Sequence, residues 1–364
     1  MMAVTFNLFH PGFQARDMTT PADIFLPKWI AWEVTRRCNL NCIHCRSASR
    51  ADSKTAEFST AEAFALIDAI REVSSPVLVL TGGEPLLRGD LFEIVRYGTE
   101  RGLRMCLATN GTLLTDSFCV SLRENGIRMV SLSLDGASEE VHDDFRRCPG
   151  AFAGVLRGIE TLRRNGIPFL INSSFTKRNR HDIAATFRLA KTLGATAWYL
   201  FMVVPIGRGK EILEELIPAG EYEEILRWHW RQEQQEETLL MRPTCAPHYF
   251  RVTAQEGGNG APRRRLAFAT GENRGCLAGR QICLIDAEGE LKPCSYFLSS
   301  VGNVRTVPFR QLWFQAPTLR RLRDTSLLQG KCGVCEFVSV CGGCRARADA
   351  VFGEYTSADL GIEL

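Results

Sequence analysis

The sequence lacks the features that would assign it to a membrane or to a nucleic acid. No run approaches the roughly 18 consecutive apolar residues that a membrane-spanning helix needs. The first residues do not join a charged segment to a long apolar stretch, so we expect no signal peptide and a cytoplasmic protein. The formal net charge is only +3, which argues against nucleic acid or a membrane surface as a partner.

Cysteine, by contrast, is abundant and unevenly distributed. The chain of 364 residues has 14 cysteines, and in a cytoplasmic protein such a number favours metal ligands over disulfides. Three of them, Cys38, Cys42 and Cys45, lie in one short segment, and seven more follow residue 275. Hydrophobic residues make up 45% of the chain, so a large core can form without cross-links.

The middle of the chain alternates between strand-like and helix-like patterns. Apolar runs of strand length occupy 29–34, 77–82, 104–109, 129–134, 168–174 and 197–204. Helical patterns lie between them, over roughly 59–73, 89–101, 115–125, 152–165 and 179–193. Strands that alternate with helices predict an α/β fold with parallel strands and right-handed crossovers. Because we count six units rather than eight, we expect a partial, splayed (β/α)6 barrel.

A polar or glycine-rich motif follows each predicted strand. The motifs are the three-cysteine segment, GGEP (82–85), TNG (109–111), SLDG (133–136), NSS (172–174) and VPIGRG (204–209). The carboxyl ends of parallel strands meet at one edge of such a fold, and active sites are found there. The six motifs therefore predict a single site.

The spacing C-x3-C-x2-C of Cys38, Cys42 and Cys45 provides three thiolates and no fourth nearby. Three thiolates can hold three irons of a [4Fe–4S] cube and leave the fourth iron free for a ligand. Two alternatives are a zinc site completed by His44 or by a distant residue, and buried structural cysteines. The strand-end motifs favour the cluster.

The three-cysteine segment and the order of the later motifs resemble the radical S-adenosylmethionine (SAM) superfamily. In that family the free iron chelates SAM, and one electron from the cluster cleaves SAM to methionine and a 5′-deoxyadenosyl radical. The resemblance implies that SAM contacts Gly82, Gly83, Glu84, Pro85, Asn110, Ser133, Asp135, Asn172 and His44. Adjacent glycines allow a close approach of the backbone, the Glu84 carboxylate can accept from an ammonium group, and His44 offers a flat ring to adenine.

The C-terminal cysteines resemble the SPASM extension, which carries auxiliary [4Fe–4S] clusters. A zinc ribbon is the alternative, because two C-x2-C pairs are typical of it too. By order along the chain, the resemblance implies a first auxiliary site with the ligands Cys276, Cys283, Cys294 and Cys344. A second site would use Cys332, Cys335 and Cys341. The second site lacks a thiolate, which a carboxylate, Cys245 or the substrate could replace, so one or two auxiliary clusters are expected.

Several longer strings resemble one subgroup, the SAM-dependent haem synthases of the siroheme-derived pathway. The strings are AWEVTRRCNLNCIHCRSAS, VPIGRG, CAPHYFR and KCGVCEFVSVCGGCRARA. The resemblance implies that two propionates of iron-coproporphyrin III become vinyl groups, with a flavodoxin or ferredoxin as electron donor. The substrate-binding residues that we expect are His248 as an axial iron ligand and Arg208, Arg242 and Arg251 as carboxylate partners. Another tetrapyrrole, as in haem d1 synthesis, or a peptide is the alternative substrate.

The motifs divide the chain into four expected parts. An N-terminal extension covers 1–28, and the radical SAM core covers 29–210. A bridging segment with substrate contacts covers 211–270, and the auxiliary cluster domain covers 271–364.

Overall fold

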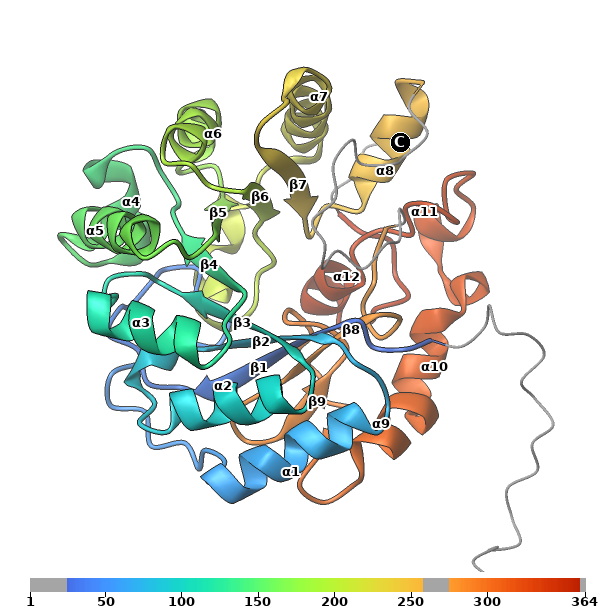
Figure 1. The fold of residues 1–364 in the computed structure, drawn as a ribbon. Helices are drawn as coiled ribbons and strands as arrows, with labels where there is room; N and C mark the ends of the chain where they lie inside the picture. The colour runs from blue at the N-terminus through green and yellow to red at the C-terminus, as the bar shows by residue number, and fades with distance from the viewer. Residues whose placement is uncertain (1–24, 258–274, 361–364) are drawn as a thin grey trace, which may run out of the picture.

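The computed structural model describes residues 25–257 and 275–360. Most of the expected N-terminal extension, and the junction between the bridging segment and the cluster domain, lie outside these residues. Six strands follow one another both in sequence and in space: β1 (Trp29–Thr35), β2 (Val77–Gly82), β3 (Arg104–Thr109), β4 (Met129–Ser133), β5 (Phe169–Phe175) and β6 (Ala197–Met202). All neighbouring pairs among them are parallel (Figure 1), which confirms the predicted fold class.

Two further parallel strands, both from outside the predicted core of residues 29–210, extend the sheet beyond the six predicted strands. β7 (Leu240–Thr244) pairs with β6, and β8 (Ile282–Ile285) pairs with β1 at the other side. β9 (Glu290–Lys292) and β10 (Gly302–Asn303) add antiparallel strands beyond β8. β7 was not predicted because Pro243 stands within it. Proline is tolerated there because β7 is an edge strand, where one row of backbone groups needs no partner.

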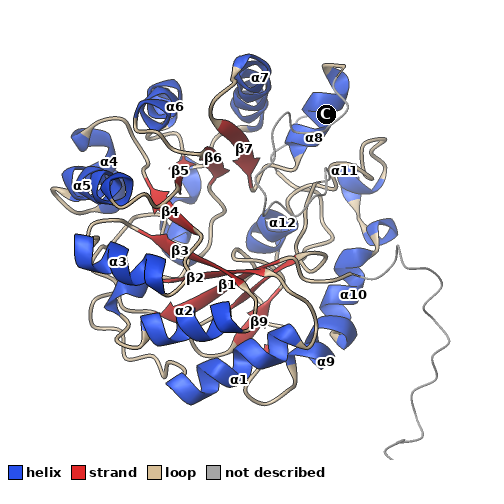
Figure 2. Cartoon of the chain, viewed as in Figure 1, coloured by secondary structure: helices blue, strands red, loops and turns tan. Residues whose placement is uncertain are grey.

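Helices cover the outer face of the curved sheet (Figure 2). They are α1 (Thr60–Arg71), α2 (Leu91–Glu100), α3 (Asp116–Glu124), α4 (Glu139–Arg146), α5 (Ala151–Arg164), α6 (Ile183–Thr192) and α7 (Ala219–Gln235). The predicted capping box at Ser59 is present: its hydroxyl accepts from the Glu62 backbone N–H, and the Glu62 carboxylate accepts from the Ser59 N–H. None of the helices among the described residues is long and apolar enough to cross a membrane.

The remaining α-helices lie in the second half of the chain. They are α8 (His248–Gln255), α9 (Phe309–Gln315), α10 (Pro317–Arg323), α11 (Gly330–Gly333) and α12 (Arg345–Phe352). The 3-10 helices are η2 (Pro85–Leu87), η3 (Arg180–Asp182), η4 (Gly207–Glu215) and η5 (Thr325–Leu327).

The alternation of side chains along each strand divides the apolar residues between two faces. On β2, Leu78 and Leu80 join the large core cluster that also contains α-helical residues such as Ile67, while Val77 and Val79 belong to a smaller cluster with the inner residues of neighbouring strands. Both faces of the parallel strands are thus apolar, as expected for strands covered on both sides. The polar residues are left to the strand ends, where the site forms.

Candidate active site and cluster-binding cysteines

The segment with Cys38, Cys42 and Cys45 forms the loop that follows β1. The Arg208 side chain holds this loop: its Nε donates to the Cys42 carbonyl at 2.8 Å and its Nη1 to the Ser49 carbonyl at 2.9 Å. Its backbone N–H also donates to the Cys45 carbonyl at 3.0 Å. Arg208 is only 5% exposed and does not line the cavity described below, so in this structure it anchors the loop, and its Nη2 has no hydrogen-bond partner among the described residues.

Two glycines allow neighbouring strand ends to press against the cysteine loop. A Cβ atom at Gly83 would stand 2.1 Å from the carbonyl oxygen of Arg37. A Cβ atom at Gly207, where φ is +57°, would stand 2.3 Å from the carbonyl oxygen of Arg46. Contacts this short with backbone atoms leave no room for any side chain. The glycines of GGEP and VPIGRG therefore fix the position of the loop that carries the thiols.

Replacing Gly83 with alanine is expected to displace the cysteine loop and to destabilise the fold by about 1–3 kcal/mol, the usual cost of forcing an extra carbon into a packed site. The bound iron and the affinity for SAM should both fall, which iron analysis and equilibrium dialysis against SAM would measure. Gly89 provides a matched control, because its Cβ would meet no atom within 4 Å. Equal SAM affinity in both variants would contradict this role of Gly83.

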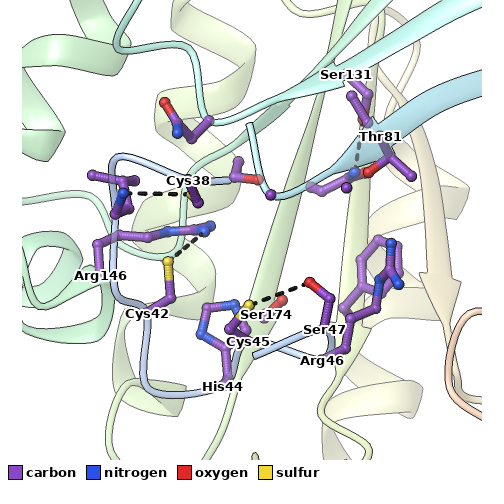
Figure 3. A pocket seen from close by; sticks show the side chains of 18 of the residues that line it. Cys38, Cys42, His44, Cys45, Arg46, Ser47, Thr81, Ser131, Arg146 and Ser174 are labelled. Atoms are coloured by element: carbon purple, nitrogen blue, oxygen red, sulfur yellow. Dashed lines mark hydrogen bonds between the residues drawn. The ribbon is translucent and has the colours of Figure 1, made fainter. Parts of the chain in front are cut away.

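A cavity of about 200 Å³ opens at the carboxyl ends of the strands, beside the three thiols (Figure 3). Nine of the residues expected to bind the cluster or SAM line it, namely Cys38, Cys42, His44, Cys45, Gly82, Gly83, Asn110, Ser133 and Asn172. They come from the ends of five different segments of the fold. Because the carboxyl ends of parallel strands lie at one edge of the sheet, the predicted residues meet in one cavity.

Asn172 presents an unused acceptor to this cavity. Its Nδ2 donates to the Ser131 hydroxyl at 2.7 Å, while its Oδ1 is buried without a hydrogen-bond partner among the described residues. A buried polar atom without a partner is costly, and a bound donor would remove that cost. The hydroxyls of a ribose are suitable donors, in agreement with the role that the family resemblance implies for Asn172.

Glu84 and Pro85 do not line the cavity. The Glu84 carboxylate is fully buried and accepts from the Thr109 hydroxyl at 2.7 Å, from the Asn110 N–H at 2.9 Å and from the Leu86 N–H at 3.2 Å. Burial raises the pKa of Glu84 to about 7 in spite of these donors. In this conformation Glu84 joins the ends of β2 and β3, and the part of GGEP that faces the cavity is its two glycines.

Asp135 is likewise buried behind the cavity wall. Its Oδ1 accepts from the Ser174 N–H at 2.7 Å, and its Oδ2 lies 2.5 Å from Nη2 of Arg146. The Nη1 of Arg146 points to the Cys42 sulfur at 3.5 Å (Figure 3). Arg146 therefore links a buried carboxylate to one of the three thiols. Arg146 was not among the expected site residues, because no helix was predicted over residues 139–146. Ser138 followed by two glutamates is nevertheless a helix-start signal.

His44 packs against the same group. Its ring stacks on Phe145, with centroids 4.4 Å apart and planes at 25°, and its Nε2 lies 3.7 Å from Oδ2 of Asp135. Burial, together with the nearby charge of Arg146, holds the pKa of His44 well below its usual range. His44 is therefore a neutral, flat surface at the edge of the cavity rather than a cation.

Two of the three thiols lie in surroundings that disfavour a bare thiolate. Burial raises the pKa of Cys38 to about 12, and the neighbouring thiols of Cys42 and Cys45 add to this effect. Burial also raises the pKa of Cys42. Iron ions would replace the thiol protons and compensate the negative charge that the thiols otherwise avoid. Since none of the 14 cysteines is in a disulfide, the trio is available to a cluster.

The other expected substrate residues lie away from the cavity. His248 is 1% exposed, with its Nε2 3.1 Å from Oδ2 of Asp359, and Arg251 is 4% exposed, with its Nη2 2.5 Å from Glu223. Arg242 lies on β7 opposite Tyr199. None of the three lines the cavity. The cavity is lined instead by four residues that were not expected at the site, although Arg46 lies within one of the strings quoted above: Arg46, Arg146, Phe201 and Tyr296.

Most of the expected ligands of the first auxiliary site are buried thiols. Burial and the thiols of Cys276 and Cys344 raise the pKa of Cys294. Cys283 lies in β8, where burial raises the pKa of its thiol and the charge of Arg323 lowers it. Burial and the thiols of Cys344, Cys294 and Cys276 also raise the pKa of Cys245, which was not among the four expected ligands.

The second expected auxiliary site includes Cys332 and Cys341. Burial raises the pKa of Cys341 to about 12, and Cys332 and the Asp359 carboxylate act in the same direction. The Nη2 of Arg345 donates to the Cys332 sulfur at 3.4 Å. The Asp359 carboxylate therefore lies near Cys332 and Cys341. A carboxylate is one of the three groups that could replace the missing thiolate of the second site. Among the described residues, no three Cys, His, Asp or Glu side chains converge as ligands of a single metal ion would.

Comparisons with known proteins agree with this architecture. Residues 32–190 match the radical SAM superfamily, and residues 276–345 match the SPASM iron–sulfur cluster-binding domain. Streptococcus suis SuiB bound to S-adenosylmethionine has a similar fold, with a TM-score of 0.72 over 92% of this chain and 76% of that chain, at 15% identity. The chain is therefore a radical SAM enzyme with a cysteine-rich C-terminal domain for auxiliary iron–sulfur clusters.

Two curated relatives define the group more closely. The AdoMet-dependent heme synthase of Methanosarcina barkeri is 47% identical over 90% of this chain and 94% of that protein. The AdoMet-dependent heme synthase of Nitratidesulfovibrio vulgaris is 41% identical over 91% of each chain. Within the superfamily, the chain belongs to the family of these haem synthases.

Proposed function

We propose that this enzyme converts iron-coproporphyrin III into protohaem by oxidative decarboxylation of two propionates to vinyl groups. The observation that carries the proposal is the similarity to two AdoMet-dependent heme synthases along nine-tenths of the chain. The cavity supports it, because it combines three cluster ligands with an unused acceptor and with aromatic side chains. We assign SAM binding to residues 29–210, auxiliary clusters to 271–364 and the connection between them to 211–270.

The reaction balances with SAM as the only oxidant. Each propionate loses one hydrogen atom from its β-carbon, its carboxylate carbon as CO2 and one electron. One SAM accepts a hydrogen atom and an electron and leaves as 5′-deoxyadenosine and methionine. When bound, the cluster at Cys38, Cys42 and Cys45 and its SAM supply the 5′-deoxyadenosyl radical that takes the hydrogen atom.

The chain's own residues would bind and enclose the substrate. Phe201 and Tyr296, whose ring centroids are 6.5 Å apart, offer apolar faces for a porphyrin plane at the cavity wall. Arg46, which pairs with the buried Glu33, is the cation at this wall that we now propose for a propionate, in place of Arg208 and Arg251. The mostly buried surroundings keep water from the reacting groups.

We make two further proposals, which concern the electron donor and the location of the enzyme in the cell. The cluster must be reduced before the first SAM is cleaved, and for this electron we propose a flavodoxin or a ferredoxin as donor; the electron released by each propionate balances the one that SAM accepts. We also propose a cytoplasmic location, because the enzyme has 14 free thiols, most of them in metal-binding patterns, and oxidising compartments favour disulfides instead.

An anaerobic assay with the reconstituted enzyme, SAM, dithionite and iron-coproporphyrin III tests the function. Mass analysis should show the loss of two formic-acid equivalents from the porphyrin, with two molecules of 5′-deoxyadenosine formed per protohaem. Intact porphyrin beside continued formation of 5′-deoxyadenosine would contradict the proposal and indicate another substrate, such as a haem d1 precursor or a peptide. Enzyme with Cys38, Cys42 and Cys45 all replaced by alanine serves as the blank.

A further inference from the structure

We propose that an acidic electron-carrier protein docks on the basic outer surface of α9 and α10. This surface, which we call the α9–α10 face, consists of Arg310, Arg320 and Arg321 and of a small pocket that Arg321 lines. The inference rests on the proposed function, which needs a carrier to reduce the enzyme, and it adds where that carrier binds. In each encounter one electron passes from the carrier to the enzyme, and the carrier leaves oxidised by one electron.

Acidic residues are missing from the sequence around these helices. Between Glu290 and Asp324 lie 33 residues with one lysine, five arginines and no aspartate or glutamate. The whole chain is nearly balanced, with 44 basic and 41 acidic residues. Positive charge is therefore concentrated in this segment, although the net charge of the protein is small, and such a concentration attracts a partner of opposite charge.

The three arginines of the α9–α10 face are exposed and have no acidic partner. Arg310, Arg320 and Arg321 lie beyond 4 Å from every carboxylate that the structure describes. Two other cations of the same segment do have such partners: Lys292 lies 3.5 Å from Asp286, and the Arg305 guanidinium lies 3.5 Å from Glu62. The exposed charge of α9 and α10 thus remains available to another molecule.

Aromatic and backbone contacts hold the three side chains in place. The Cζ of Arg310 lies 5.5 Å from the ring centroid of Phe314, and the Cζ of Arg321 lies 5.3 Å from that of Tyr355. The Nε of Arg320 donates to the Phe314 carbonyl at 3.3 Å. These contacts order the guanidinium groups without neutralising them, so docking costs less side-chain entropy than it would at free arginines.

The pocket of the α9–α10 face connects this surface with the C-terminal cysteines. Its volume is about 30 Å³, and Arg321, Arg345, Cys276 and Cys341 are among the residues that line it. Cys276 is an expected ligand of the first auxiliary site, and Cys341 is one of the second. Because electron transfer slows steeply with distance, a carrier seated here is well placed to exchange an electron with either site.

Docking on the α9–α10 face leaves the SAM cavity free. The two helices follow each other along the outside of the molecule, on the side opposite to α4, α5 and α6 (Figure 1). The pocket beside them and the cavity at the strand ends have no lining residue in common. A carrier can therefore bind while SAM and the porphyrin occupy the enzyme.

The size of the α9–α10 face favours a small protein over a nucleic acid. Each helix has seven residues, which corresponds to a length of about 10 Å. Nucleic-acid binding typically uses roughly 6 to 10 phosphate contacts, more than three arginines supply. Encounters between electron-transfer proteins, by contrast, bury less than roughly 1,200 Å² and depend largely on complementary charge.

The binding test reverses two of the charges in the holoenzyme. An acidic flavodoxin serves as the probe, and isothermal titration at about 20 mM salt, where screening is weak, measures its Kd. Arg320→Glu with Arg321→Glu should raise the Kd at least about tenfold. The matched control is Arg157→Glu with Arg163→Glu, which reverses two exposed arginines of α5 that likewise have no ion pair among the described residues. An unchanged Kd in the α10 variant, or equal weakening in both variants, would overturn the proposal.

The rate of electron entry separates docking from damage to the enzyme. With reduced flavodoxin, the α10 variant should form 5′-deoxyadenosine about tenfold more slowly than its parent. With dithionite, which needs no docking surface, the two rates should be equal. Equal slowing with both reductants would reject the α9–α10 face. Normal cleavage of SAM with an intact porphyrin would contradict the proposed function and leave the docking surface standing.

A neutral variant covers the case in which the reversed charges prevent folding, since glutamates in the last turn of α10 also oppose the helix dipole. Arg320→Gln with Arg321→Gln should weaken flavodoxin binding about threefold and make the Kd less dependent on salt. An identical salt dependence in the parent would reject the face. So would a single-stranded RNA or anionic vesicles that bind the parent more tightly than flavodoxin does and lose affinity in this variant.

Discussion

Replacing Cys42 with alanine is expected to abolish SAM cleavage, the largest effect that we expect from any single change to this chain. Cys42 is one of the three thiols that line the cavity within residues 25–257 and 275–360, and its loss leaves too few ligands for the cluster that supplies the electron. Iron should fall by about four per chain. The production of 5′-deoxyadenosine from SAM and dithionite, measured by liquid chromatography, should fall to that of a protein-free control.

Cys148→Ala is the matched control for this experiment. Cys148 packs against the same small cluster of residues as Cys38 and Cys42, yet its sulfur lies 3.8 Å from the carbonyl of Pro149. It does not line the cavity. The Cys148→Ala protein should therefore keep its iron and its SAM cleavage. If it lost them, the trio would have a fourth protein ligand and no open iron for SAM.

The second large effect is expected at Arg146. Its replacement by methionine should lower the free energy of unfolding by about 3–5 kcal/mol, which is the usual cost of removing one partner of a buried ion pair. The reason is Asp135, which is fully buried and would lose the cation 2.5 Å away. Anaerobic urea denaturation followed by circular dichroism measures the difference. The exposed neighbour Arg147, replaced in the same way, should change stability by less than about 0.5 kcal/mol.

A double variant separates the ion pair from simple packing. If Asp135→Asn is added to Arg146→Met, no buried charge remains without a partner, so the double variant should be more stable than the sum of the two single effects predicts. Additive effects would show that the arginine contributes through its shape alone. The reduction potential of the cluster in Arg146→Met, from EPR-monitored titration, would show in addition whether the contact with Cys42 affects the iron.

Much of the fold could be predicted because the relevant signals are local. Apolar runs located the six strands from β1 to β6 within two residues, and the rule that parallel strand ends share an edge brought Cys38, Gly82 and Asn172 to one cavity. The strand β7 was missed because it contains Pro243, and α4 because its start signal at Ser138 was not used.

The differences between the expected site and the structure have a common physical cause, which is contact between residues far apart in the sequence. Whether an arginine meets substrate or backbone depends on what packs beside it, and Arg208 meets the carbonyls of a loop about 160 residues away. In the same way, the order of cysteines does not reveal that Cys283 falls inside a strand that pairs with Ile30. Residue type and spacing indicate which residues can be ligands. The residues that each of them contacts are determined by the tertiary fold.

The pairing of β8 with β1 also has a consequence for how the protein is made. β1 leaves the ribosome early, but its partner on one side is translated roughly 250 residues later, or about 10–50 seconds at ordinary elongation rates. Until β8 has been synthesised, the backbone groups on one edge of β1 have no partner, and such an edge can associate with other chains. Insertion of iron and sulfide into the growing chain is therefore expected to come late, after synthesis has supplied both edges of β1.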